Sequence, residues 1–363
     1  MLNNLDENML ENIISLIYNN KNILCISKRL YELIRKYKTI ILNFNNNTNI
    51  ISKKLLEKKY KNVFIRAYKI NNKDDYITHL YLKHINNMNI LNLNLSSNLH
   101  TLELGKNFNE KIDDLPNKLN TLILHGSFNQ NIYNLPITLE TLILYGSFNQ
   151  TIYNLPKKLH ILKLGTKFNQ TINNLPENLY MLELWGNFNK KIDNLPEKLH
   201  ILKLSYQFNY FINDLPKNLH TLILGNNFNQ KIDNLPKNLH TLILGYKFNQ
   251  TIDNLPEKLH KLVLRGLFNQ KIDNLPKELH ILELWNNFNQ KIDNLPKKLH
   301  TLILDEFNQE LNNLPENLNI LELGYDFNHS IEKLPNKLNI LRLSQNYNKK
   351  NIPLYLKDII IYY

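Results

Sequence analysis

The sequence lacks most of the features that anchor, cross-link or export a protein. Cys25 is the only cysteine among 363 residues, so a disulfide within the chain is excluded and a reducing compartment is expected. No run of about 18 apolar residues is present, and the N-terminus has no signal-peptide pattern. We therefore expect a soluble intracellular protein without a membrane partner.

The motifs of common catalytic sites are also missing. There is no glycine-rich phosphate loop, no His-Glu-x-x-His, no cysteine pair and no Gly-x-Ser-x-Gly elbow. We therefore expect neither an enzyme nor a bound cofactor. The net charge is +12, of which +8 falls in residues 1–100 and only +4 in residues 101–363. Nucleic-acid binding needs clustered Lys and Arg beside stacking aromatics, so we expect no nucleic-acid partner.

What the sequence does contain is a repeat with a period of 20 residues. A Phe-Asn pair recurs in phase, and a Leu-Pro pair recurs at a second fixed phase. The nine glycines fall just after the expected strands, where a turn can require positive φ. A short fixed period predicts a solenoid. The phenylalanines of the Phe-Asn pairs are at positions 108, 128, 148, 168, 188, 208, 228, 248, 268, 288, 307 and 327.

One repeat predicts one short strand. Leu242 and Leu244 alternate with Thr241 and Ile243, which is typical of a strand with one buried face. Such strands bury their leucines only by stacking in parallel, about 4.8 Å apart. Pro236 cannot lie inside a sheet and marks an extended or 3₁₀ return segment. The fold predicted is a leucine-rich-repeat-like β-solenoid with parallel strands, in which the Asn after each Phe bonds backbone groups of the turn.

The repeat also resembles a known family. The pattern Leu-Pro-x-x-Leu-x-x-Leu-x-Leu-Gly-x-x-Phe-Asn-Gln-x-Ile is similar to the FNIP repeat, a relative of leucine-rich repeats found in social amoebae and in giant DNA viruses of amoebae. The resemblance covers about residues 95–350, although the period here is shorter than the family's usual one. It implies a protein-binding array over 95–363 with a C-terminal closing strand, and a host-cytoplasm location if the protein is viral. Residues 41–94 read as degenerate repeats or an N-terminal cap.

Residues 1–40 have helical spacing and neither proline nor glycine. They resemble the middle of an F-box, although Leu5-Asp6 replaces its usual Leu-Pro and Leu30-Tyr31 its usual Trp. An F-box implies a substrate-recognition subunit of a cullin-type ubiquitin ligase, with an adaptor-binding patch. The alternatives are a helical cap that closes the solenoid and, for the whole chain, a binding scaffold or decoy with no role in ubiquitination. The patch expected is Leu5, Met9, Ile13, Ile23 and Leu24.

Three sets of repeat residues are candidates for chemistry or binding. A row of histidines precedes the strands, and a row of aspartates lies on the return side. The side chains of a straight row do not converge on one metal ion, however. Lys163, Glu183 and Lys203 alternate in sign and predict a row of ion pairs. Large residues that depart from the repeat consensus are plausible anchors for a target protein, and packing on the turn is equally open for each. These are Tyr145, Trp185, Arg265 and Trp285.

Overall fold

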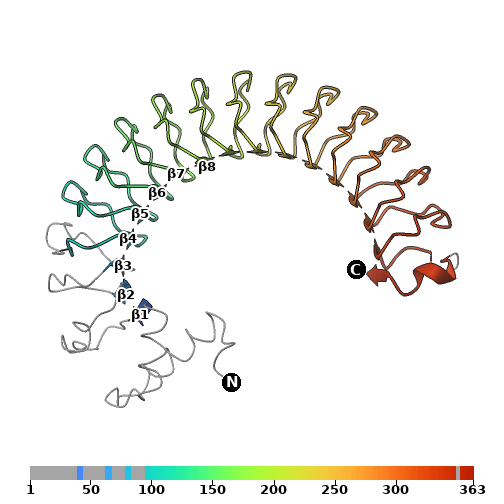
Figure 1. Cartoon of the computed structure of the whole chain (residues 1–363), viewed down its shortest axis with the longest axis horizontal. Helices are drawn as coiled ribbons and strands as arrows, with labels where there is room; N and C mark the ends of the chain where they lie inside the picture. The colour runs from blue at the N-terminus through green and yellow to red at the C-terminus, as the bar shows by residue number, and fades with distance from the viewer. Residues whose placement is uncertain (1–38, 44–61, 68–77, 83–94, 349–351) are drawn as a thin grey trace, which may run out of the picture. The chain divides into compact units, whose positions relative to one another are not determined.

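The computed structural model describes residues 39–43, 62–67, 78–82, 95–348 and 352–363 (Figure 1). The chain divides into two compact units, Met1–Ser147 and Phe148–Tyr363. Each unit is described by itself.

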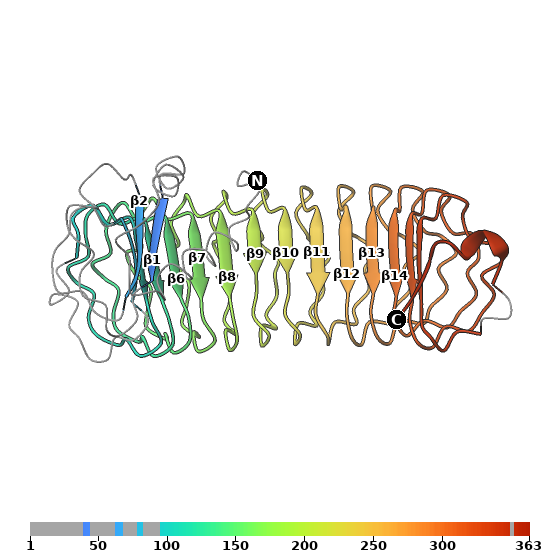
Figure 2. The ribbon, with the colours of Figure 1, turned by 90° about the horizontal axis from the view of Figure 1, so that it is seen from below.

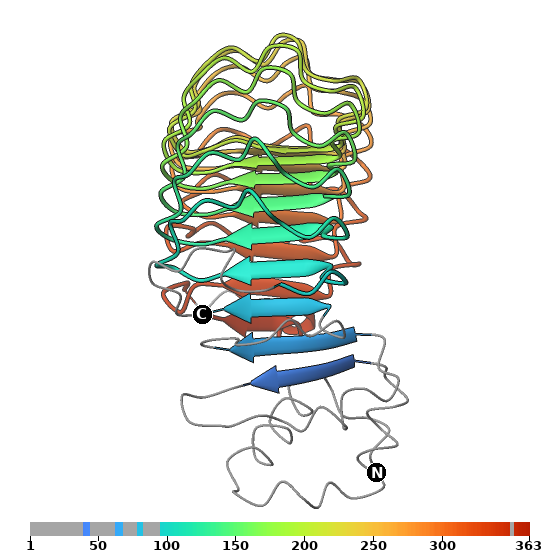
Figure 3. The same ribbon diagram turned by 90° about the vertical axis from the view of Figure 1, so that its left-hand side faces the viewer.

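The described residues of the first unit form six short parallel strands, each paired with the next in chain order. Figure 3 shows them stacked with their arrowheads pointing the same way. Leu80 pairs with Leu102, and Leu102 pairs with Leu122, so identical positions of successive repeats meet. The strands are β1 (Thr39–Asn43), β2 (Asn62–Ala67), β3 (His79–Leu82), β4 (Thr101–Leu104), β5 (Thr121–Leu124) and β6 (Thr141–Leu144).

The second unit contains eleven parallel strands, again paired in chain order. Figure 2 shows β9 to β14 side by side. The strands are β7 (Ile161–Leu164), β8 (Met181–Leu184), β9 (Ile201–Lys203), β10 (Thr221–Ile223), β11 (Thr241–Leu244), β12 (Lys261–Leu264), β13 (Ile281–Leu284), β14 (Thr301–Leu304), β15 (Ile320–Leu323), β16 (Ile340–Leu343) and β17 (Ile360–Tyr362).

The burial pattern confirms the strand phase read from the sequence. Leu242 and Leu244 are fully buried, whereas Thr241 and Ile243 are half-buried. The same alternation recurs along both units, because a leucine at each inward position meets its counterpart in the next repeat. The prediction of a leucine-rich-repeat-like β-solenoid with parallel strands is confirmed for the described residues.

The return segments are built from turns rather than helices. The backbone N–H of Leu239 donates to the carbonyl of Pro236 at 3.0 Å, and this Pro-to-Leu turn recurs in repeat after repeat. Proline fits there because its missing N–H is not needed and its φ is preset. The described residues contain no α-helix, and their only 3₁₀ helix is η4 (Leu354–Leu356).

A continuous stack of phenylalanines fills the core beneath the return segments. In the second unit, neighbouring rings from Phe148 to Phe327 lie 6.1–6.4 Å apart between centroids and are nearly parallel. Hydrogen-bonded strands lie only about 4.8 Å apart. Each repeat is therefore wider at its phenylalanine than at its strand. The strands of this unit consequently line the inner side of a curve, and the return segments line the outer side (Figure 1).

The glycines after the strands have two different roles. Four of the nine have positive φ, the conformation that favours glycine, namely Gly126, Gly146, Gly186 and Gly266. Gly225 and Gly245 have ordinary φ values and serve another purpose. A Cβ at either position would collide with the backbone carbonyl of the preceding repeat, so glycine there permits close stacking.

The C-terminal closing strand forms, but its register differs from the repeat pattern. Continuing that pattern would pair Ile359 with Leu341, whereas the structure pairs Ile360 with Leu341 and Tyr362 with Leu343. η4 occupies the segment where earlier repeats have a turn, and the slip of one residue follows it. Leu356 remains fully buried, so the core continues to this point.

Candidate functional site

The outward-facing side chains of β7 to β16 form one continuous surface on the inner side of the second unit, here called the strand face. Its residues are half-buried, except Glu183 and Val263, which are buried. Apolar side chains occupy half of the outward positions, and Thr, Lys, Glu or Arg occupy the others. The apolar residues are Ile161, Met181, Ile201, Ile223, Ile243, Val263, Ile281, Ile303, Ile320 and Ile340.

The charged residues of the strand face are paired with one another. The carboxylate of Glu183 lies between Lys163 and Lys203, at 3.2 and 3.6 Å from their ammonium nitrogens. The prediction of a row of ion pairs at these three residues is confirmed. Two further cross-strand pairs, Lys261 with Glu283 at 2.6 Å and Arg342 with Glu322 at 3.1 Å, complete the set. Every charge of the strand face therefore has an opposite charge beside it, with Glu183 shared by two lysines, and the apolar side chains lie between these pairs.

Three of the predicted anchor residues lie along one rim of this face. Trp185, Arg265 and Trp285 each follow the last residue of a strand, in β8, β12 and β13 respectively. Arg265 and Trp285 belong to adjacent strands, whereas Trp185 lies four strands from Arg265. Trp185 and Arg265 are exposed, and Trp285 is half-buried. Tyr145 belongs to the first unit, where its ring stacks on His125 with 5.0 Å between centroids.

Sequence reasoning missed a partner of the second tryptophan. The indole N–H of Trp285 donates to Glu283 Oε2 at 3.2 Å, so the ring lies against the Lys261–Glu283 ion pair. The tripeptide Glu-Leu-Trp indicates this contact, because residues two apart in a strand share a face. The same tripeptide occurs at 183–185.

The asparagine of each Phe-Asn pair has the structural role that was predicted. In the second unit, Asn229 Oδ1 accepts the backbone N–H of Asn249 at 3.0 Å and the side-chain amide of Gln250 at 3.1 Å. Equivalent bonds of 2.9–3.1 Å link Asn149 through successive repeats to Asn328. These bonds satisfy backbone donors where the chain has left the sheet. On the outer side of the second unit, these polar groups are therefore satisfied by hydrogen bonds within the chain.

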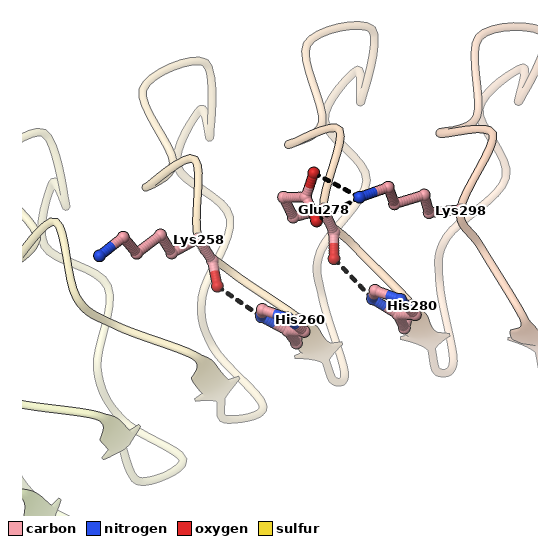
Figure 4. Close-up of polar contacts among 5 residues, drawn as sticks. All are labelled: Lys258, His260, Glu278, His280 and Lys298. Carbon is pink, nitrogen blue, oxygen red and sulfur yellow. Dashed lines mark hydrogen bonds and ion pairs between the residues drawn. The ribbon is translucent and has the colours of Figure 1, made fainter.

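The histidines before β9 to β13 form a stack with Tyr180 at its start. Centroids of adjacent rings are 4.6–5.3 Å apart. The Nδ1 atom of each histidine lies 2.6–3.1 Å from the carbonyl oxygen two residues earlier, so Nδ1 carries the proton and donates it. Figure 4 shows this contact at His260 and His280. The rings are therefore fixed in one orientation, with their Nε2 atoms side by side rather than converging.

Lysines and a carboxylate flank this stack (Figure 4). Lys298 Nζ lies 2.6 Å from both carboxylate oxygens of Glu278, and this hydrogen bond holds the pKa of Glu278 below its usual range. Lys258 Nζ donates instead to Asn238 Oδ1 at 3.0 Å. Within the described residues, no group of three or more His, Cys, Asp or Glu side chains is arranged to hold a metal ion. No helix there is long and apolar enough to cross a membrane.

Comparison with known sequences identifies the repeat. The FNIP Repeat family matches three stretches of the chain, residues 211–247, 228–266 and 307–346. The chain thus carries FNIP repeats. No curated protein matches the sequence.

Comparison with solved structures places the fold among leucine-rich-repeat proteins. The giant-virus protein CroV588, described as a novel circular LRR protein, is 32% identical with a TM-score of 0.60. The match covers 86% of this chain and 57% of CroV588, so this chain spans little more than half of that protein. YopM from Yersinia enterocolitica is 19% identical, with a TM-score of 0.53 and coverage of 83% and 64%. YopM from Yersinia pestis is 20% identical, with a TM-score of 0.52 and coverage of 92% and 93%.

The predicted N-terminal site lies outside the described residues. Residues 1–38 of the predicted helical module and its adaptor-binding patch therefore stay predictions, whereas Thr39 and Ile40, the last two residues of that module, begin strand β1 and are not helical. The patch consists of Leu5, Met9, Ile13, Ile23 and Leu24.

Zinc titration of the wild-type chain tests the geometry of the histidine stack. Parallel rings do not direct their Nε2 atoms to one ion, so we expect no tight stoichiometric binding in calorimetry. A one-to-one zinc isotherm would contradict the structural role of the stack.

Proposed function

We propose that this chain is a protein-binding solenoid whose strand face holds a target protein, and that residues 5–35 connect the captured target to a cullin-type ubiquitin ligase. The strand face carries the first part of the proposal. It is a broad, partly apolar surface whose charges are already paired within the chain.

The energetics of this surface favour a protein partner. Burying an unpaired charge is costly, whereas the ion pairs here enter an interface with their partners in place. The aliphatic side chains between them lose water when a target covers them, at about 25 cal/mol for each Å² of apolar area. Ile223 and Ile243 occupy the same position in adjacent strands and form the centre of this surface, beside the buried Val263.

The rim supplies candidate anchors beside that centre. Tryptophan and arginine are over-represented among residues that dominate binding energy. Trp185 on one side and Arg265 and Trp285 on the other flank a stretch of the rim where the equivalent residues are small, namely Ser205, Gly225 and Gly245. A target segment lying on Ile223 and Ile243 would thus pass between large side chains on both sides.

The link to a ubiquitin ligase rests on the resemblance of residues 5–35 to an F-box. The rival function is a binding scaffold or decoy with no role in ubiquitination, which needs the strand face but no adaptor. The two functions make different demands only on the N-terminal residues. One experiment therefore tests target binding by the strand face, and a second tests adaptor binding by the N-terminal residues.

Target capture should depend on the strand face. The change Ile243→Lys introduces an unpaired charge at the centre of the surface, whereas Thr251→Lys adds the same charge at an exposed position of a return segment. Proteins retained from an amoebal lysate by the wild-type chain should also be retained by Thr251→Lys and lost by Ile243→Lys. With a purified target, Arg265→Ala should weaken binding about tenfold. Equal retention by the two lysine variants would contradict the assignment of the face.

Adaptor capture should depend on the N-terminal patch. If residues 5–35 are an F-box, the double change Leu5→Ala, Met9→Ala removes apolar contacts with the adaptor. Binding to purified adaptor should then be lost in a pull-down, and the melting temperature of the repeats should stay unchanged, since each repeat contacts only its neighbours. Failure of the wild-type chain to bind the adaptor, with a lowered melting temperature in the variant, would instead identify these residues as a cap.

A further inference from the structure

One repeat interrupts the polar outer surface of the second unit with two aromatic residues. Other repeats place polar pairs such as Gln230-Lys231 and Gln250-Thr251 where this repeat has Tyr210-Phe211. Phe211 is 65% exposed and Tyr210 is 38% exposed. Phenylalanines of the repeating Phe-Asn pairs are, by contrast, at most 2% exposed. One exposed apolar residue is common on protein surfaces, but two adjacent exposed rings beside a hollow form a small apolar patch that a partner can cover.

These rings border a hollow on the outer side of the solenoid. It measures about 180 Å³ and lies between the return segments that precede β9 and β10. The residues that line it include Lys191, Asp193, Tyr210, Phe211 and Asp214. Pockets for drug-sized molecules span roughly 300–1,000 Å³, so this hollow has the size for a single side chain.

Its charge follows from a local reversal of the repeat sequence. Five other repeats have Asp followed by Asn in this turn, with the Asp at positions 193, 233, 253, 273 and 293. An Asn amide at the second position donates to the Asp of the preceding repeat in two places, Asn134 to Asp113 at 3.3 Å and Asn274 to Asp253 at 3.5 Å. Here the order is Asn213-Asp214, so a second carboxylate replaces the amide beside Asp193.

The two carboxylates are left for an external partner. In the part of the chain that the structure describes, Asp193 and Asp214 make no side-chain hydrogen bond or ion pair, with Lys191 or any other residue. Two acids against one lysine give the lining a net negative charge.

We propose that this hollow binds an arginine side chain presented by a partner protein. A guanidinium is flat, stacks on aromatic rings and donates hydrogen bonds to carboxylates in a forked geometry. The rings of Tyr210 and Phe211 offer the stacking surface, and Asp193 and Asp214 offer the acceptors. A lysine ammonium is more strongly hydrated and cannot stack in this way, so it binds less well. The site lies on the opposite side of the solenoid from the strand face and does not depend on the function proposed for that face.

The test uses the full chain with 4-fluorophenylalanine in place of Phe211 alone, followed by ¹⁹F NMR. N-acetyl-arginine amide should shift the signal saturably, with a dissociation constant in the millimolar range, about 1–10 mM. N-acetyl-lysine amide should bind at least about threefold more weakly, and N-acetyl-glutamine amide should give no saturable shift.

The variant Asp214→Asn is the matched control, because it places an Asn amide at the position next to Asp193, as Asn274 is placed next to Asp253. It should keep or raise the melting temperature and weaken arginine binding about tenfold through the loss of one charge-assisted hydrogen bond. The proposal is overturned if arginine gives no saturable shift, if glutamine binds equally, or if Asp214→Asn binds arginine as tightly as the wild-type chain.

Discussion

The structure depends on one constraint: each repeat must place its atoms at a fixed displacement from the same atoms of the next. Backbone hydrogen bonds set that displacement at about 4.8 Å along the strands. The phenylalanine stack sets it at 6.1–6.4 Å on the far side of the core in the second unit. Both spacings hold together only if the unit curves with its strands inside. Curvature is thus a consequence of which residue fills each layer, and it turns the strand face into a concave surface.

The same constraint determines which groups remain free to bind a partner. A side chain that recurs in every repeat meets its own copy, and most recurring polar groups are satisfied in this way. Asn229 bonds Asn249, the histidine rings stack, and Lys298 pairs with Glu278. Binding capacity therefore resides on the strand face and at positions that break the repeat, such as Arg265 and Phe211.

Periodicity allowed the fold to be predicted because each repeat gives an independent reading of the same rule. The strand phase of Leu242 and Leu244, the Pro236 turn and the structural role of Asn229 all followed from residue type at a fixed position. Features that depend on the contact between two repeats could not be predicted from residue type in this way. The close contact at Gly225, the slipped register of Ile360 and the hydrogen bond from Trp285 to Glu283 each arise from geometry between neighbouring segments. The anchors were chosen from departures in the consensus, but the hollow at Tyr210-Phe211 was missed, because its charge comes from the swapped order of Asn213 and Asp214.

The central claim is that register between repeats, rather than any single contact, holds the solenoid together. Deleting residues 229–248 removes one whole repeat and joins Phe228 to Asn249, which keeps the register. Deleting residues 229–238 removes half as many residues but leaves the chain between β10 and β11 too short for a return segment. We expect the first deletion to keep a cooperative thermal transition and a β-type circular dichroism spectrum, and the second to lose both. Equal damage from the two deletions, or greater damage from removing the whole repeat, would contradict this account.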